Sequence, residues 1–158
     1  MKITVLGCSA SEGIPAIFCN CDLCRQARER KIYRTRSQIL INDDMLVDFP
    51  PDTYYRSLVM GVELGKIENI LVTHSHCDHF YADDFFARGD WSSFCLPVET
   101  VTIHGNTAIR NAFERNGYAK KKGTYVHESR GMINGYNVYD QSSEYTVHKP
   151  FETFTAGK

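Results

Sequence analysis

The sequence predicts a single domain of the mixed α/β class that includes residues 1–158. Its 158 residues match the length of one ordinary domain, and no internal repeat or low-complexity linker divides them. Hydrophobic residues make up 42% of the chain and charged residues 23%, which is typical of a globular protein. Short apolar runs alternate with helical patterns through the first two thirds of the chain, and this alternation favours a sheet with flanking helices.

Cap, turn and proline signals indicate where these elements begin and end. Asp22 predicts the start of a helix, because an aspartate caps the first turn. Residues 42–44, Asn-Asp-Asp, have the chemistry of a hairpin turn. Pro50 and Pro51 predict another helix start, since proline suits the first turn. The expected helices cover residues 22–31, 50–60, 80–87 and 106–116, and the expected strands cover residues 2–7, 37–41, 45–48, 69–72, 100–104, 136–139, 145–148 and 151–155.

His74, His76, Asp78 and His79 form a dense group of metal-binding side chains directly after an apolar strand, residues 70–72. His74 and His76 are two positions apart, so at a strand end their side chains point to the same face and can hold one metal. The turn that follows can direct Asp78 and His79 to a second metal close by. Two adjacent metals lower the pKa of a shared water and so supply a hydroxide at neutral pH. The pattern therefore favours a metal-dependent hydrolase over a set of unrelated surface histidines.

Cys19, Cys21 and Cys24 form a second group with the spacing C-x-C-x-x-C. In a reducing compartment such spacing favours metal binding over disulfides. A structural zinc takes four ligands, and no fourth ligand lies nearby in the sequence. We expect zinc at this group, with a reduced, metal-free cluster as the alternative. Cys77 alternates away from its neighbours in the histidine segment, so we expect it to be buried and not a ligand.

Residues 73–79 resemble the H-x-H-x-D-H signature of the metallo-β-lactamase superfamily. Residues 1–8 are similar to the first strand of that fold. Residues 11–15, followed by residues 19–24, resemble the branch that contains the phosphoribosyl cyclic phosphodiesterase (PhnP-like) of phosphonate catabolism. The resemblance is clearest over residues 1–104.

This resemblance implies the N-terminal portion of an αββα sandwich, a mixed sheet with flanking helices. It implies two divalent metals, zinc or manganese, with His74 and His76 on the first and Asp78 and His79 on the second. Asp78 would also act in catalysis by orienting the hydroxide. It further implies a structural zinc on the three cysteines, completed by a distant histidine.

Family members complete the two-metal site with ligands from the second half of the sandwich. His148 and Asp140 are candidates for these ligands, but residues 146–151 are similar to the connection that precedes the third ligand. We therefore expect the missing ligands beyond Lys158, in a chain truncated to the N-terminal half. Such a chain would bind metal weakly and have low or no activity alone.

Three further residues are candidates for supporting roles. The resemblance implies that Asp48 supports the metal loop by hydrogen bonding, with plain turn capping as the alternative. Arg34 and Arg36 are able to contact a phosphate through two hydrogen bonds each, or to form ordinary ion pairs. His104 ends a strand and faces either a cleft or solvent.

Charge and hydropathy limit the partners. The net charge of −1 gives no bulk field that would favour nucleic acid or an anionic membrane. No run of about 18 apolar residues is present, and the N-terminus lacks the pattern of a signal peptide. We therefore expect a cytoplasmic protein with no membrane partner and disfavour nucleic acid. An uncovered apolar sheet face would favour a homodimer.

The expected function is metal-dependent hydrolysis of a small cyclic phosphodiester by a metal-bound hydroxide. One rival is a tRNA-processing ribonuclease of the same superfamily, against which the sequence shows no basic arm. A second is a thioester or lactone hydrolase of the same fold. A third is a metal-binding or assembly module without catalysis.

Overall fold

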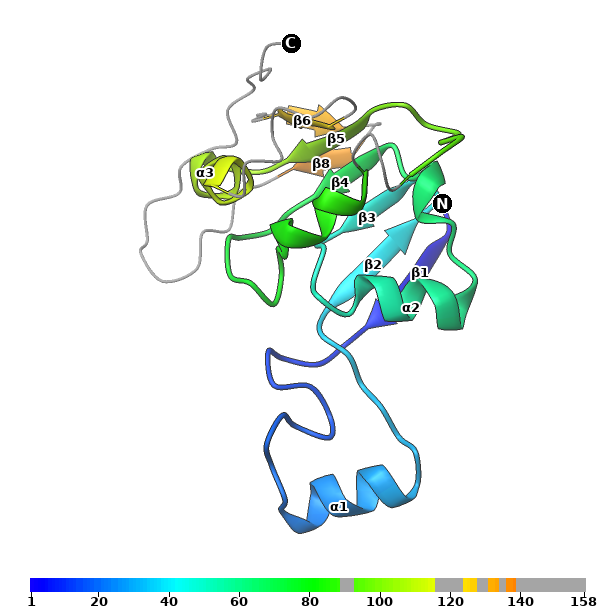
Figure 1. Cartoon of the computed structure of the whole chain (residues 1–158), viewed down its shortest axis with the longest axis vertical. Coiled ribbons are helices and arrows are strands. Elements are labelled where there is room, and N and C mark those ends of the chain that lie inside the picture. Colours follow the sequence, from blue (N-terminus) through cyan, green and yellow to red (C-terminus); the bar gives the residue numbers. More distant parts are fainter. Residues whose placement is uncertain (89–92, 116–123, 128–130, 134–135, 139–158) are drawn as a thin grey trace.

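The computed structural model describes the chain except residues 89–92, 116–123, 128–130, 134–135 and 139–158 (Figure 1). The helices are α1 (Asp22–Glu29), α2 (Thr53–Met60) and α3 (Thr107–Arg115), with the 3-10 segments η1 (Leu64–Lys66) and η2 (Ala82–Arg88). The strands are β1 (Ile3–Gly7), β2 (Gln38–Ile41), β3 (Met45–Val47), β4 (Asn69–Leu71), β5 (Val101–His104), β6 (Thr124–His127), β7 (Gly131–Ile133) and β8 (Tyr136–Val138).

Six strands form one mixed sheet in the order β1-β2-β3-β4-β5-β6, and β7 pairs with β8 in a separate hairpin. The first three strands are antiparallel, whereas β3 to β6 run parallel. The turn between β2 and β3 contains Asn42 and Asp43 with φ values of 51° and 69°. Asparagine and aspartate tolerate this left-handed region, so the hairpin predicted at residues 42–44 forms as expected.

One face of the sheet carries the hydrophobic core. Leu40, Leu46, Ile70 and Ile103 form a row across four adjacent strands, and each is buried. Phe85 from η2 and Ile109 and Phe113 from α3 join the same cluster. Alternate residues of β2 to β5 thus face helices, which confirms the predicted α/β class.

The opposite face is also apolar but is less covered. This face carries Ile3, Val5, Ile39 and Val47. Val5, Ile39 and Val47 are cross-strand neighbours one position away from Leu40 and Leu46, so their side chains point away from the core. Ile3 and Val5 on the edge strand are 54% and 55% exposed. The expectation that this face supports a homodimer stays a prediction.

Residues 8–36 leave the sheet between β1 and β2 and carry α1 away from it (Figure 1). We call this segment the cysteine arm. Isolated bridges from Ser9 to Arg36 and from Ile14 to Arg34 hold its two limbs together. Its only buried hydrophobic residues are Cys24 and Ala27, so the arm has almost no core of its own.

Several expected boundaries were wrong. Helix α1 ends at Glu29, and its N-cap is Cys21 instead of Asp22, which lies in the first turn. Helix α2 begins at Thr53, because residues 51–52 form a turn before it, and residues 82–88 form a 3-10 segment where an α-helix was expected. Strands β6 and β7 were not predicted. The strands expected at residues 145–148 and 151–155 lie outside the described residues. Within the described part, no helix is long and apolar enough to cross a membrane.

Candidate metal centre

The histidine segment occupies a loop at the carboxyl end of a central strand. We call residues 72–81 the histidine loop; it connects β4 to η2. Because β3 and β4 are parallel, the residues that follow them emerge at the same edge of the sheet. Phe49 N donates to His79 O at 2.7 Å, and Tyr81 N donates to Phe49 O at 2.8 Å. These bonds fix the histidine loop beside the segment that follows β3.

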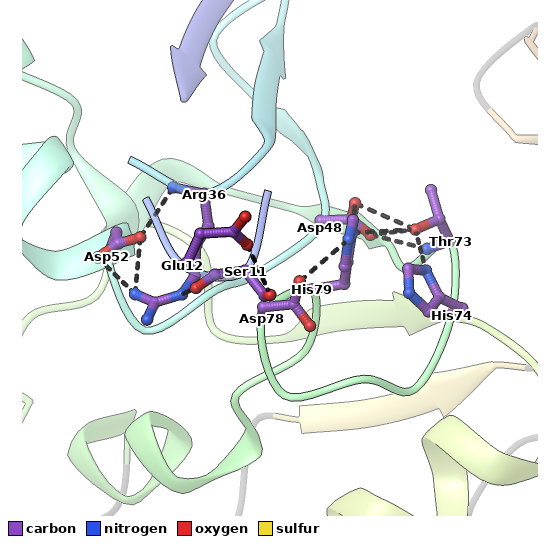
Figure 2. Close-up of polar contacts among 9 residues, drawn as sticks. All are labelled: Ser11, Glu12, Arg36, Asp48, Asp52, Thr73, His74, Asp78 and His79. Atoms are coloured by element: carbon purple, nitrogen blue, oxygen red, sulfur yellow. Dashed lines mark hydrogen bonds and ion pairs between the residues drawn. The ribbon is translucent and has the colours of Figure 1, made fainter. Parts of the chain in front are cut away.

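Asp48 is the centre of the hydrogen-bond network in this region (Figure 2). Its side chain is buried, and it accepts bonds from Thr73 N at 2.8 Å and from Thr73 Oγ1 at 2.9 Å. His79 Nδ1 lies 2.7 Å from Asp48 Oδ2. The ionised Asp48 carboxylate can only accept a hydrogen bond, so Nδ1 of His79 must carry the ring proton in this contact. The lone pair of Nε2 is then available for a metal. The geometry suits the supporting role expected of Asp48.

The three imidazoles and the Asp78 carboxylate lie together. The ring centroids of His74 and His79 are 4.0 Å apart, and those of His74 and His76 are 4.8 Å apart. His79 Nε2 lies 3.6 Å from Asp78 Oδ2. The four side chains therefore share one region and do not point apart. However, within the described residues it is the group Cys19, Cys21 and Cys24 that brings three donor atoms close enough to hold one ion, and the histidine loop does not form such a closed site.

His74 is held in the form that binds metals. Burial lowers its pKa below the usual 6.5, and the neighbouring His79 and His76 lower it further, because a second positive charge is unfavourable there. The imidazole is thus neutral at neutral pH. Neutral imidazoles and carboxylates together suit zinc, and manganese also accepts such a set.

Cys19, Cys21 and Cys24 bring their sulfur atoms within 4.8 Å of one another. Ala16 N donates to Cys24 Sγ at 3.3 Å, which positions the buried thiol. Hydrogen bonds from the backbone of Cys24 and from the thiols of Cys19 and Cys24 lower the pKa of Cys21 to about 7. A thiol with this pKa is readily deprotonated, and thiolates are the form that binds zinc. Within the described residues this cluster is the one that meets a three-ligand geometry.

The two candidate arginines differ in their surroundings. Arg36 Nη1 lies 3.0 Å from Asp52 Oδ1, its Nε donates to Ser11 O at 2.8 Å, and both charged side chains are largely covered (Figure 2). Arg36 is therefore already engaged in an ion pair, which is the alternative considered for it. Arg34 is exposed. Phosphate binding by either arginine stays a prediction.

Two other expectations were wrong. Cys77 is exposed where a buried side chain was expected, because it lies in the turn at residues 77–79 instead of in an alternating strand. His104 is buried, so the solvent-exposed alternative was wrong; its Nε2 lies 2.9 Å from Asn69 Oδ1 on the adjacent strand, and a position facing a cleft stays a prediction. His148 and Asp140 lie outside the described residues.

Sequence reasoning missed Thr73 as a member of the site. Its hydroxyl contacts both oxygens of Asp48 and lies 3.1 Å from His74 Nδ1. A hydroxyl that touches both the carboxylate and a candidate ligand orients the two together. Its position directly before the first histidine was the available signal.

Comparisons with solved structures identify the class of fold. Zinc-bound PqqB from Methylobacterium extorquens superimposes with a TM-score of 0.64 at 18% identity, covering 85% of this chain and 52% of that one. The metallo-β-lactamase fold protein YhfI from Bacillus subtilis superimposes with a TM-score of 0.53 at 22% identity, covering 78% of this chain and 44% of that one. Together with the mixed sheet and the histidine loop, these likenesses show that the chain has the metallo-β-lactamase fold.

The PhnP branch expected from the sequence is also among the structural relatives. A diphosphatase from the PhnP family superimposes with a TM-score of 0.60 at 25% identity, covering 83% of this chain and 52% of that one. The chain thus spans about half the length of the structures it matches.

Sequence comparison gives one distant relative. An octanoyltransferase from Porphyromonas gingivalis is 29% identical over 129 residues, which are 79% of this chain and 25% of that protein. No protein-family model matches the chain. Because only a quarter of the octanoyltransferase is matched, its activity does not transfer to this chain.

Proposed function

We propose that this chain supplies the histidine loop of a metal-dependent hydrolase that cleaves a small cyclic phosphodiester. The observation that carries the proposal is the histidine loop itself. His79 is oriented by a buried carboxylate, His74 is kept neutral, and Asp78 lies beside the free nitrogen of His79. An orienting carboxylate behind a ligand histidine is typical of catalytic metal sites.

The site residues of the histidine loop each have a proposed role in binding metal or in supporting a ligand. His74 and His76 would hold one divalent cation, and Asp78 and His79 would hold a second. When bound, such cations acidify a water and neutralise the charge on phosphate oxygens. Asp48 and Thr73 hold the ligands in place, and the partly buried carboxylate of Asp78 is positioned to accept a proton from an attacking water. The PhnP-family relative is a diphosphatase, which supports phosphorus as the electrophile.

Metal titration of the chain tests this assignment directly. The cysteine arm of the chelated protein is first filled with zinc. The protein is then titrated with zinc or manganese, and the additional metal bound by each chain is counted. We expect H74A and H76A to lose metal at the histidine loop, whereas C77S, an exposed substitution in the same loop, retains it. Turnover of cyclic and linear phosphodiesters is then compared with turnover of thioesters and lactones. Equal metal content in H74A and the unaltered chain contradicts the proposal.

One observation favours the ribonuclease rival as a second candidate. The sequence reasoning found no basic arm, but the structure shows that the cysteine arm projects from the sheet and exposes Arg30, Lys31 and Arg34 (Figure 1). Basic side chains on a projecting element suit a phosphate backbone. RNA binding by the chain that weakens steeply with salt supports this candidate. Binding that does not depend on these three residues counts against it.

The non-catalytic rival is favoured by the incomplete convergence of the histidine-loop donors. Binding of metal at the cysteine arm with none at the histidine loop would support it.

A further inference from the structure

Two buried polar side chains, Gln38 and Thr53, contact the turn that contains Asp48. Gln38 begins β2 and Thr53 begins α2, and each is 1% exposed. Gln38 Nε2 donates to Asp48 O at 3.1 Å and to Thr53 Oγ1 at 2.9 Å. Thr53 Oγ1 in turn donates to Pro50 O at 2.6 Å. Both hydrogens of the Gln38 amide are therefore used on the turn at residues 48–53.

The oxygen of the Gln38 amide shows that this side chain is not explained by packing. Gln38 Oε1 is buried and has no hydrogen-bond partner among the described residues. A buried acceptor without a partner costs free energy, and a methionine of similar length would avoid that cost. Gln38 is thus a poor choice for packing alone. Its contribution lies in the two hydrogen bonds that its amide nitrogen donates.

Those bonds fix a residue in an uncommon backbone conformation. Asp48 has a φ of 65°, in the left-handed region that aspartate tolerates but most other non-glycine residues avoid. Its N donates to Leu71 O at 2.8 Å, and its carbonyl oxygen accepts the Gln38 amide, so the polar groups on both sides of its Cα are held. This conformation directs the Asp48 carboxylate toward Thr73 and His79 (Figure 2).

We propose that Gln38 is a positioning residue that acts through Asp48 to set the tautomer of His79. With the carboxylate fixed 2.7 Å from Nδ1, the His79 proton stays on Nδ1 and the lone pair stays on Nε2, which lies 3.6 Å from the Asp78 carboxylate. Loss of the Gln38 amide frees the turn, the carboxylate moves, and the proton of His79 distributes over both nitrogens. This role rests on the proposed function only insofar as His79 is a metal ligand.

Nitrogen-15 NMR of the histidine rings tests the role without any metal. The chelated chain is measured at one neutral pH, and the two ring nitrogens of His79 report the tautomer. We expect the unaltered chain to show one tautomer with the proton on Nδ1, and Q38M to show a mixture of both. The matched control is S57A, which removes another buried hydroxyl from α2, one that donates to Tyr54 O within the same helix. It should leave the His79 signals unchanged.

A pair of variants at Thr53 guards against a Q38M chain that fails to fold. T53V keeps the side-chain shape but removes the hydroxyl, and T53S restores it. We expect T53V to move the His79 signals toward those of Q38M and T53S to return them. Identical His79 signals in all variants overturn the positioning role, and so does an equal change in S57A, which would indicate general loosening of the fold.

Cobalt titration separates this role from the proposed function. If both hold, Q38M binds cobalt at the histidine loop about tenfold more weakly than the unaltered chain, because the residue acts on a ligand through its hydrogen-bonding partner. If the unaltered chain binds no cobalt there, the proposed function is overturned, and the NMR result alone decides the role of Gln38.

Discussion

The cysteine arm and the histidine loop differ in how much of their order comes from the fold. The cysteine arm places three thiols within 4.8 Å of one another, yet it buries only Cys24 and Ala27. The histidine loop begins and ends near buried Val72 and Phe80 and is bonded to a buried carboxylate, yet its donor atoms do not converge on one point. One region has a nearly complete ligand set without a core, and the other has a supported backbone without a complete ligand set.

This difference suggests different uses of metal binding. A small element that lacks a core gains its structure from the metal, as in small zinc domains. A loop that is already supported by a sheet does not need the metal to fold, so its ligands can be held in a geometry that serves chemistry. We therefore expect metal removal to unfold the first region and to leave the second largely intact.

Chelation or substitution in the cysteine arm has the largest expected effect. Structural zinc contributes roughly 10 kcal/mol or more to the folding of small zinc domains, which exceeds what two buried side chains supply. We expect C24A, or strong chelation, to expose Arg25, Arg28 and Arg30 to trypsin while the amides of β2, β3 and β4 stay protected from exchange. C8A, which alters an exposed cysteine outside the cluster, should behave as the unaltered chain does. An arm that stays protected after chelation would contradict the comparison.

Substitution of Asp48 comes next. D48A removes the acceptor of three hydrogen bonds from Thr73 and His79. At about 1 kcal/mol for each bond, we expect a loss of about 3 kcal/mol in the free energy of unfolding. Urea denaturation measures the loss. D43A is the control, because Asp43 has a positive φ similar to that of Asp48, so both variants share the cost of placing alanine there, and the surface pair of Asp43 with Lys2 contributes less than about 1 kcal/mol. Equal losses in the two variants would show that the histidine loop does not depend on its carboxylate.

Substitutions of Arg36 and Arg34 compare a covered and an exposed side chain of the cysteine arm. R36M breaks a largely covered ion pair, in which Arg36 Nη1 contacts both carboxylate oxygens of Asp52, and it removes the bond from Arg36 Nε to Ser11 O, so we expect a loss of about 1–2 kcal/mol in stability. R34M alters an exposed side chain and should change stability by less than about 0.5 kcal/mol. If either residue binds phosphate, its variant also weakens the binding of inorganic phosphate to the chain. Weaker phosphate binding by R36M with unchanged stability would reverse the assignment of its ion pair.

The smallest expected effect is a pH dependence of the metal-free histidine loop. Burial, aided by the neighbouring imidazoles, lowers the pKa of His74 below 6.5 in the folded chain. The unfolded chain therefore binds the proton more readily, so the contribution of His74 is full above about pH 6.5 and is lost as the pH falls below it. Denaturation of chelated protein across this range should show a shallower slope in H74Q. A slope that H74Q leaves unchanged would assign the dependence to another group.

Local signals predicted much of the fold. The alternating runs that became β1, β2 and β5 were recognisable because one face of each strand is buried. Asn42 and Asp43 indicated the hairpin between β2 and β3, because these residue types tolerate a positive φ. Strands β6 and β7 lack a strong alternating pattern and were missed. The 3-10 segment η2 was taken for an α-helix because a pattern of apolar positions does not distinguish the two.

The site was predicted in part, for a related reason. The spacing of His74, His76, Asp78 and His79 marked a metal loop, and the structure brings these residues near one another. Thr73 carried only the signal of its position before His74, and Gln38 carried none. A threonine or a glutamine has many uses, and only its three-dimensional neighbours define which one applies. The exposure of Cys77 was likewise set by the packing of a turn.

The sequence by itself determined which donor atoms this protein offers, since thiols, imidazoles and carboxylates in close spacing are chemical facts of the chain. It also determined the class of the fold, because the periodicity of buried residues is written locally. Only the tertiary structure decided that Asp48 contacts His79, which is 31 positions away in the sequence, and that the Gln38 amide donates to the carbonyl oxygen of Asp48. Contacts between distant segments depend on how strands pair and helices pack, and no local pattern specifies those distances.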